Sequence, residues 1–328
     1  MKPQRMRRRK FLGLAAGAAA VPAVSRIAWV LDYPVRPVHI LVGFAPGSAT
    51  DILARMMAQR LSERLGQSFV VDNRPGAGGN IATEAAVNAP ADGYTLLMTS
   101  GANTINPTLY EKLSFDFLKD TTPVAGVTRS PLVMEVNNAV PAKTVPEFIA
   151  YTKANPGRVN MASSGIGTSL HISGELFKMM TGANMTHVPY RSAAAALTDL
   201  MGGQVQVLFD VIASSLSYVK AGQVRALAVT SASRSDALPG VPTVGEFVPG
   251  YEASACNGLV APRNTPAEIV TKLNKAVNDV LAEPAMRAQL ADLGATELTG
   301  PAAEWGALLS AEVAKWAKVV KFSGAKAE

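Results

Sequence analysis

One local pattern constrains the fold of this chain more than any other: an apolar strand runs into a turn of small residues and then into a helix. The strand is expected at His39–Val42 and the turn at Phe44–Ser48, and the helix begins near Thr50 or Asp51. Apolar residues recur every four positions along this helix, at Leu53, Met57, Leu61 and Leu65. Because backbone N–H groups of the turn and the positive end of the helix dipole face the same space, this segment predicts a place for an anion.

The same construction occurs a second time further along the chain. Val159–Ala162 reads as a strand, 163–169 as a turn with the sequence Ser-Ser-Gly-Ile-Gly-Thr-Ser, and a helix follows through Leu176 and Met179. Two such loops on two α/β units predict that one ligand is held from opposite sides.

The rest of the chain alternates short apolar runs with helical stretches, which is typical of βαβ units and a largely parallel sheet. Further strands are expected at Phe69–Val71, Thr95–Met98, Leu132–Val136, Val205–Phe209, Ala226–Val229 and Leu259–Ala261. The C-terminal segments 266–283 and 302–322 read as helices without a clear strand. We therefore expect them to pack back onto the first α/β unit.

The first 25 residues have the pattern of an export signal. They contain six basic residues and no acidic residue, followed by an apolar run and by small residues before Ser25. The apolar run is shorter than the roughly 20 residues that a membrane span needs. Arg8 and Arg9 read as a twin-arginine motif, with Arg7 where Ser or Thr is usual. We predict a signal peptide over 1–25.

Composition excludes several other classes of protein. The chain has 31 Lys and Arg against 25 Asp and Glu, and without the six basic residues of the signal the numbers are 25 and 25. A neutral mature protein gives no indication of nucleic-acid or anionic-membrane binding. Cys256 is the only cysteine, which excludes an intrachain disulfide and a lipid-anchored cysteine at the signal. A soluble periplasmic protein of two compact domains is predicted.

A series of motifs in a fixed order extends through most of the chain. These are Phe44-Ala45-Pro46-Gly47 with Thr50-Asp51, Asn73–Asn80, Asp92–Leu96, His187–Arg191, Leu227–Thr230, Val241–Thr243 and Gly258–Pro262. Over residues 33–322 the chain resembles the periplasmic solute-binding proteins of the tripartite tricarboxylate transporters, also called the Bug family.

The resemblance implies an α/β fold of two lobes, the type II periplasmic binding-protein or Venus-flytrap fold, in which each lobe is a mostly parallel sheet flanked by helices. Lobe one is expected to comprise 33–129 plus 256–328, and lobe two 130–255. The chain would cross between the lobes near Arg129–Pro131 and Ser254–Asn257. We expect a monomer without cofactor or metal that captures a small organic carboxylate and delivers it to membrane permease subunits.

We predict that backbone N–H and hydroxyl donors of the two loops hold the carboxylate. The predicted ligand-binding residues are Phe44, Ala45, Gly47, Ser48, Ala49, Thr50, Asp51, Ser100, Asn103, Ser163, Ser164, Gly165, Thr168, Ser169, His171, Arg191 and Asp210. Some of these have a structural alternative: a tight turn for Gly47 and Ser48, a first-turn acid for Asp51, helix caps for Thr168, Ser169 and Asp210, core packing for His171, and an exposed helix lead-in for Arg191.

Two other functions compete with a transport receptor. One is a sensory receptor that signals to a membrane kinase, which the sequence does not distinguish from a transport protein. The other is a secreted hydrolase, for which the chain has no Gly-x-Ser-x-Gly turn and no pair of its three histidines at metal-ligand spacing. We predict a binding protein and no enzyme. Compatible ligands are mono-, di- and tricarboxylates, aromatic acids and amino acids.

Overall fold

The computed structural model describes residues 32–327. The predicted signal peptide over 1–25, with Arg8 and Arg9, lies outside the described residues. Within 32–327, none of the helices has both the length and the apolar character needed to cross a membrane.

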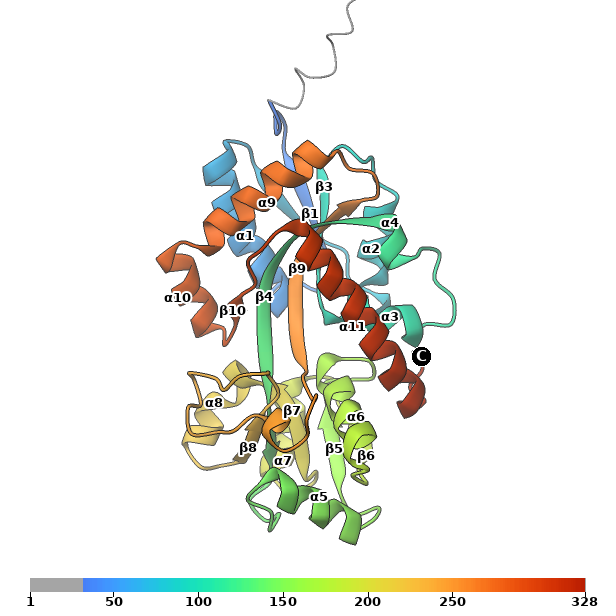
Figure 1. Ribbon diagram of the computed structural model, residues 1–328, viewed down its shortest axis with the longest axis vertical. Coiled ribbons are helices and arrows are strands. Elements are labelled where there is room, and N and C mark those ends of the chain that lie inside the picture. The colour runs from blue at the N-terminus through green and yellow to red at the C-terminus, as the bar shows by residue number, and fades with distance from the viewer. Residues whose placement is uncertain (1–31, 328) are drawn as a thin grey trace, which may run out of the picture.

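The strands form one curled sheet that runs through both halves of the molecule (Figure 1). The upper half in Figure 1 holds β1 (Val38–Val42), β2 (Phe69–Asn73) and β3 (Thr95–Thr99), and the lower half holds β5 (Asn160–Ser163), β6 (Thr186–Pro189), β7 (Val207–Val211) and β8 (Arg225–Val229). Two long strands pass from one half to the other, β4 (Thr121–Val136) and β9 (Ser254–Pro262), and the short β10 (Thr296–Glu297) pairs with β4. The main order is β2-β1-β3-β9-β4-β7-β5-β6.

Parallel pairing is confined to the outer strands of each half. β1 pairs in parallel with β2 and β3, and β5 pairs in parallel with β6 and β7. β4 and β9 run antiparallel to each other, from Thr121 opposite Pro262 to Pro131 opposite Ser254, and antiparallel to their other neighbours. The two halves are therefore joined by an antiparallel pair of strands.

Helices pack against both faces of the sheet in each half. The upper half has α1 (Ala49–Leu65), the turn η1 (Ala77–Gly79), α2 (Asn80–Val87), α3 (Gly101–Leu109), α4 (Phe117–Asp120), α9 (Ala267–Leu281) and α10 (Pro284–Asp292). The lower half has α5 (Val145–Ala154), α6 (Ser169–Thr181), α7 (Ala193–Met201), α8 (Ile212–Lys220) and the turn η2 (Val244–Glu246).

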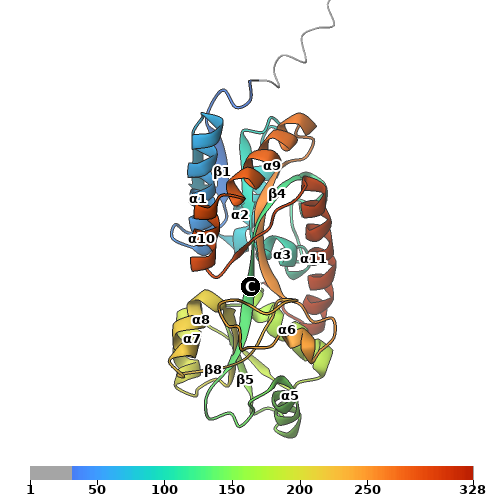
Figure 2. The same ribbon diagram turned by 60° about the vertical axis from the view of Figure 1, so that its left-hand side comes forward.

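The C-terminal helix α11 (Ala302–Ser323) extends along the side of the molecule from the upper half to the lower half (Figure 2). Trp305 near its start is buried in a cluster with Leu97 of β3. Trp316 and Val320 near its end belong to a different buried cluster, which includes Phe177 of α6. The helix therefore contacts both halves.

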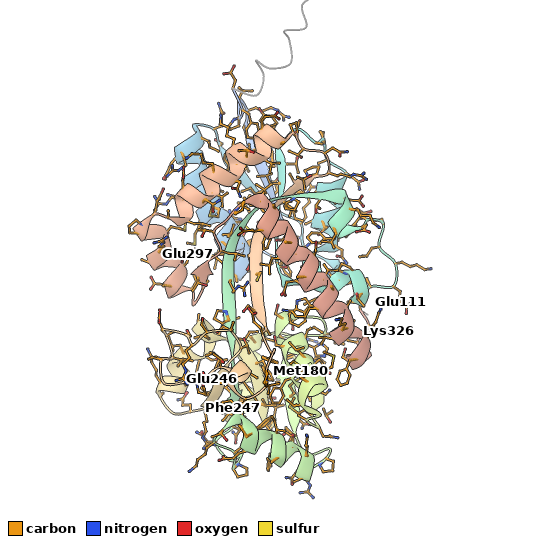
Figure 3. The ribbon with its side chains drawn as sticks, in the orientation of Figure 1. Glu111, Met180, Glu246, Phe247, Glu297 and Lys326 are labelled. Atoms are coloured by element: carbon orange, nitrogen blue, oxygen red, sulfur yellow. The ribbon has the colours of Figure 1, made fainter. Side chains whose placement is uncertain are left out.

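The end of the chain lies beside α3. Lys326 Nζ lies 2.8 Å from Glu111 Oε1, and the two side chains meet at the edge of the molecule (Figure 3). The Ala327 N–H donates to the carbonyl of Leu109 (3.2 Å). These contacts continue the packing of α11 against α3.

Local sequence explains the first strand–turn–helix unit. α1 begins at Ala49, one residue before the predicted start, because Ser48 is its N-cap and accepts the Asp51 N–H on its Oγ (3.3 Å). The helix ends at Leu65 and is capped by Gly66, which adopts the left-handed conformation (φ +71°) that glycine tolerates. Its apolar stripe is buried against the sheet, through Leu53, Met57 and Leu61.

β4 differs most from the sequence prediction. It begins at Thr121, whereas only Leu132–Val136 was expected, and the additional part contains Pro123, Gly126 and Pro131, residues that are unusual within a central strand. The ladder with β9 has register shifts at Pro123/Ala125 and Gly126/Thr128, and Pro131 pairs with Ser254 at its end. β6 and the short β10 were also not predicted.

Candidate functional site

A cavity of about 480 Å³ lies between the two halves of the molecule. Its wall includes residues that follow β1, β3, β5 and β7, together with Ser130 of β4 and Asn257 of β9. The turn after α10 adds Leu293 and Ala295. Loops at the carboxyl ends of parallel strands are where α/β proteins bind ligands.

Two of the helices at this cavity begin with the same hydrogen bonding. In α1 the Asp51 N–H donates to Ser48 Oγ (3.3 Å), and in α6 the His171 N–H donates to Thr168 Oγ1 (3.3 Å). The first two N–H groups of each helix have no acceptor in the described part of the chain, and all four residues line the cavity: Ala49, Thr50, Ser169 and Leu170. Two pairs of unused donors therefore border the cavity, one from each half.

Two further helices begin at the same cavity. At α3 the Ser100 N–H donates to Asn103 Oδ1 (2.9 Å), while Ser100 Oγ is buried and has no partner within 32–327. Gly101 in the first turn of α3 and Ala213 in the first turn of α8 line the cavity. The positive ends of four helices, α1, α3, α6 and α8, thus border one space.

No charged side chain lines this cavity among the residues that the structure describes. Apolar side chains form much of its wall, including Phe44, Ile52, Leu53, Leu109 and Ile166. The helix N-termini therefore contribute positive potential to this space, each being equivalent to roughly half a positive charge. Such an arrangement favours an anion attached to an apolar body.

The two halves touch at the edge of the cavity, and glycines make the contact possible. A Cβ atom built on Gly101 of α3 would lie only 2.6 Å from Ser169 Oγ of α6. A Cβ on Gly167 would collide with Leu109 of α3. The starts of α3 and α6 therefore approach so closely that a side chain at position 101 would force Ser169 to move.

The structure separates the predicted ligand-binding residues into two groups. Six of them line the cavity: Phe44, Ala49, Thr50, Ser100, Thr168 and Ser169. The others do not line it: Ala45, Gly47, Ser48, Asp51, Asn103, Ser163, Ser164, Gly165, His171, Arg191 and Asp210.

In the first loop, two of the predicted donors are used internally. The Gly47 N–H donates to Asp51 Oδ2 (2.8 Å), and the Ser48 N–H donates to the carbonyl of Ala45 (3.1 Å). The donors of this segment without a partner are instead those of the helix start at Ala49 and Thr50.

Asp51 lies in the first turn of α1 and is hydrogen-bonded within the protein, which fits its interpretation as a first-turn acid. Its carboxylate accepts from Arg55 Nε (3.0 Å), from Asn73 Nδ2 (2.8 Å) and from the Gly47 N–H, and its side chain is buried. The hydrogen bond from Arg55 lowers the pKa of Asp51 to about 2. Asp51 is therefore ionised at neutral pH and holds the loop by accepting these hydrogen bonds.

Two histidines, His171 and His187, hold the second loop through side-chain hydrogen bonds. The Gly167 N–H donates to His171 Nδ1 (3.1 Å), and Ser163 Oγ, which accepts the Gly165 N–H, lies 2.6 Å from His187 Nε2. The two imidazole rings stack with centroids 3.7 Å apart. Burial lowers the pKa of His171 to about 3 and that of His187 to about 4, so both rings are neutral at pH 7.

Arg191 is exposed and does not line the cavity. Asp210 is hydrogen-bonded within the protein. Asp210 Oδ1 accepts the Val211 N–H (2.7 Å) at the start of α8. Ser215 Oγ lies 3.3 Å from Asp210 Oδ2 and 2.8 Å from Glu135 Oε1. Burial raises the pKa of Asp210 to about 6 and that of Glu135 to about 8.

Sequence reasoning missed other parts of the wall. Some missed residues follow directly on predicted ones, and extension of each loop by one helical turn would have found them: Ile52, Leu53, Gly101, Ala102, Leu170, Ala213 and Ser214. Leu293 and Ala295 had no sequence signal, because only the fold of the C-terminal region brings them to the cavity.

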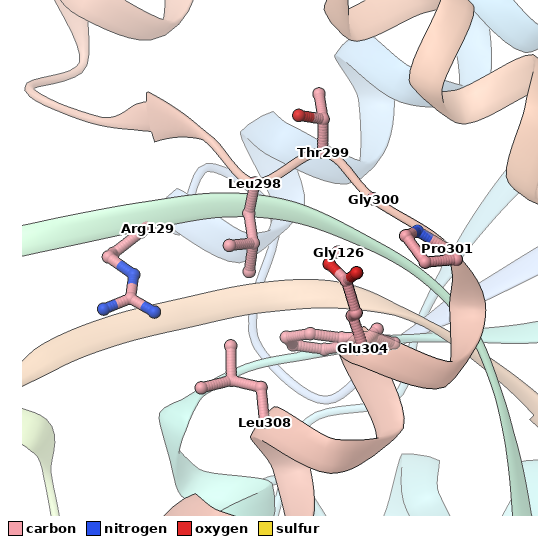
Figure 4. Close-up of a pocket in the computed structure, with 9 residues that line it drawn as sticks. Gly126, Arg129, Leu298, Thr299, Gly300, Pro301, Glu304 and Leu308 are labelled. Atoms are coloured by element: carbon pink, nitrogen blue, oxygen red, sulfur yellow. The ribbon is translucent and has the colours of Figure 1, made fainter.

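A smaller cavity of about 190 Å³ lies beside β4 and the start of α11 (Figure 4). Gly126, Arg129, Leu298 and Glu304 are among the residues around it. It shares no residue with the larger cavity and contains none of the predicted ligand-binding residues.

Comparisons with known proteins agree with this geometry. The family model described as tripartite tricarboxylate transporter family receptor matches residues 53–324. The chain is 36% identical over 319 residues to BugT of Bordetella pertussis, covering 96% of each chain.

Solved structures give the same result. The R. palustris protein Rpa4515 with adipate is 40% identical, with a TM-score of 0.77 over 89% of this chain and 98% of that one. MatC of Rhodopseudomonas palustris with bound malate is 33% identical, with a TM-score of 0.73 over 88% of this chain and 100% of that one. The predicted type II fold and family are thereby confirmed, and this chain belongs to the receptor family of the tripartite tricarboxylate transporters, which includes the Bug proteins.

Proposed function

We propose that this protein is a periplasmic receptor that binds a small organic carboxylate in the cavity between its halves and delivers it to the permease subunits of a tripartite transporter. One observation carries the proposal: four helix N-termini from both halves border a cavity that no charged side chain lines within the described residues. Backbone donors at Ala49, Thr50, Ser169 and Leu170 would hold the carboxylate. The adipate and malate bound to the two related structures support this ligand class.

Binding would proceed by closure of two lobes, 33–129 plus 256–328 and 130–255. The strands β4 and β9 support this division, because their antiparallel ladder joins the halves at Arg129–Pro131 and Ser254–Asn257. Small backbone rotations in these two strands would move the lobes as rigid bodies. The close approach of Gly101 to Ser169, which this structure already has, would belong to the closed arrangement of the lobes.

A hydrolase is the alternative function that the structure has to be weighed against, because Ser163 and His187 lie close together. Ser163 Oγ lies 2.6 Å from His187 Nε2, a distance that also suits a nucleophile and its base. Ser163 is fully buried, however, and neither residue lines the cavity. Burial also lowers the pKa of His187 to about 4, which makes the ring a weak base. We assign the pair a structural role under the second loop.

A thermal-shift screen of acids, followed by calorimetric titration, tests the proposal. The panel contains succinate, adipate, tricarballylate, benzoate and 3-phenylpropionate, and a ligand at 100 times its Kd adds about 2.7 kcal/mol to the free energy of unfolding. We expect at least one acid to bind with 1:1 stoichiometry and to be recovered unchanged. Turnover of a bound acid, or no stabilisation by any member of a broad acid panel, would refute a carboxylate receptor.

A further inference from the structure

The smaller cavity, of about 190 Å³, has charged side chains of both signs in its wall, Arg129 of β4 and Glu304 of α11. In Figure 4 these two side chains lie apart, with Leu298 and Leu308 between them. We propose that this cavity is a second binding site, for a small zwitterion whose carboxylate and ammonium groups are joined by a short aliphatic chain. The inference does not depend on the function proposed for the larger cavity, because the two cavities share no residue.

Arg129 can bind the carboxylate of such a ligand. A guanidinium carries five N–H donors, and within 32–327 the Arg129 side chain has one acceptor, Glu252, which it contacts through Nη1. The Nε and Nη2 groups therefore remain available, and the side chain is 31% exposed, so that a solute can reach it. Trp305, also in the wall, adds a buried indole N–H that has no acceptor in the described part of the chain. A ligand carboxylate would give these donors a partner.

Glu304 can bind the ammonium group at the other end. Its side chain is exposed and has no ion-pair partner among the residues that the structure describes. The carboxylate lies against the turn at Gly300, where a Cβ atom would come within 2.9 Å of Oε2. As a first-turn acid of α11, Glu304 also interacts favourably with the helix dipole, and this interaction leaves its oxygens able to accept hydrogen bonds. An ammonium group would supply both a counter-charge and N–H donors.

The wall between the two charges is apolar and fixed in place. Leu298 packs directly on β4, where a Cβ atom on Gly126 would lie 2.8 Å from Leu298 Cγ, and its N–H donates to a carbonyl of β4 (3.0 Å). Asn274 Nδ2 donates to the carbonyls of Gly300 (3.0 Å) and Val124 (2.8 Å), which ties the turn to the same strand. A ligand would therefore enter a preformed space, and little of its binding energy would be spent on ordering the protein.

NMR titration of the labelled, folded protein tests the inference. The indole N–H signal of Trp305, assigned as the one that Trp305→Phe removes, reports on this cavity, and no tryptophan within 32–327 lines the larger one. We expect 5-aminopentanoate to shift this signal saturably, with a Kd on the order of 1 mM. Pentanoate and pentylamine each lack one of the two charges, and we expect them to bind about five-fold more weakly.

A matched pair of variants locates the ammonium group. Glu304→Gln keeps the size of the side chain and removes its charge, and it should raise the Kd of 5-aminopentanoate about five-fold while leaving that of pentanoate unchanged. Glu268→Gln is the control, because Glu268 is an exposed first-turn acid of α9 that does not line the cavity. It should bind 5-aminopentanoate as the wild type does.

Several outcomes would overturn the inference: no saturable shift of the Trp305 signal by 5-aminopentanoate, equally tight binding of pentanoate or pentylamine, or equal effects of the two variants. The titration is repeated with the larger cavity saturated by the tightest acid of the panel. The shift should persist, whereas its loss by competition would place the zwitterion in the larger cavity and refute a second site. Failure of every acid to bind would refute the proposed function alone.

Discussion

Proline in place of Ala49 should weaken ligand binding without disturbing the fold. Ala49 is the first residue of α1, where proline is well tolerated, and Ser48 before it has the extended backbone (φ −68°, ψ 157°) that precedes proline. The substitution removes an N–H that has no acceptor within the described residues. A hydrogen bond to a charged group contributes about 1.5 to 3 kcal/mol. Titration calorimetry with the tightest acid should therefore show a Kd about 10- to 140-fold higher.

The matched control is Ala49→Val, which adds similar bulk and keeps the N–H. It should bind within a few-fold of the wild type, and circular dichroism should show that both variants are folded. Unchanged affinity in folded Ala49→Pro would refute the role of this donor, and an equal loss in Ala49→Val would show that crowding is the cause. Proline at Ser48 is a poorer test, because that N–H donates to the carbonyl of Ala45.

Three further variants test other parts of the argument. Gly101→Ala should weaken binding because its Cβ would lie 2.6 Å from Ser169 Oγ. When Ser169→Ala removes that oxygen, the double variant should bind as tightly as the Ser169→Ala single variant. A double variant that still binds more weakly would mean that this contact does not limit closure. Burial raises the pKa of Glu135 from 4.5 to about 8, so between these two pH values the folded protein keeps a proton that the unfolded chain has released. The free energy of unfolding of the wild type should therefore fall by up to about 1.4 kcal/mol per pH unit in this range. Urea denaturation should show that Glu135→Gln becomes more stable relative to the wild type as the pH rises from about 5 to about 8. A difference in unfolding free energy that does not grow with pH would contradict a protonated Glu135 in the folded protein. Changing Arg8 and Arg9 to Lys should keep the precursor in the cytoplasm, as cell fractionation would show, whereas normal export would reject the twin-arginine route.

The sequence by itself determined the two strand–turn–helix units and offered Thr168 as a cap of the second. Thr168 accepts the N–H three residues ahead, and the apolar stripe of α1 is buried where its spacing indicated. These features depend on residues within one or two helical turns of each other, so a local reading of the chain contains the needed information. The ordered motifs also identified the family, which the comparisons confirm.

Only the tertiary structure decided which groups face the ligand cavity. The loop sequence does not reveal that Asp51 is occupied by Asn73, a residue 22 positions away that reaches it through the pairing of β1 with β2. Leu293 and Ala295 line the cavity, and β10, which follows them in the chain, is held there by its pairing with β4. The long β4 likewise contains prolines that argue against a strand until β9 pairs with it. In each case the deciding contact joins residues far apart in the chain, and local propensity carries no information about such pairs.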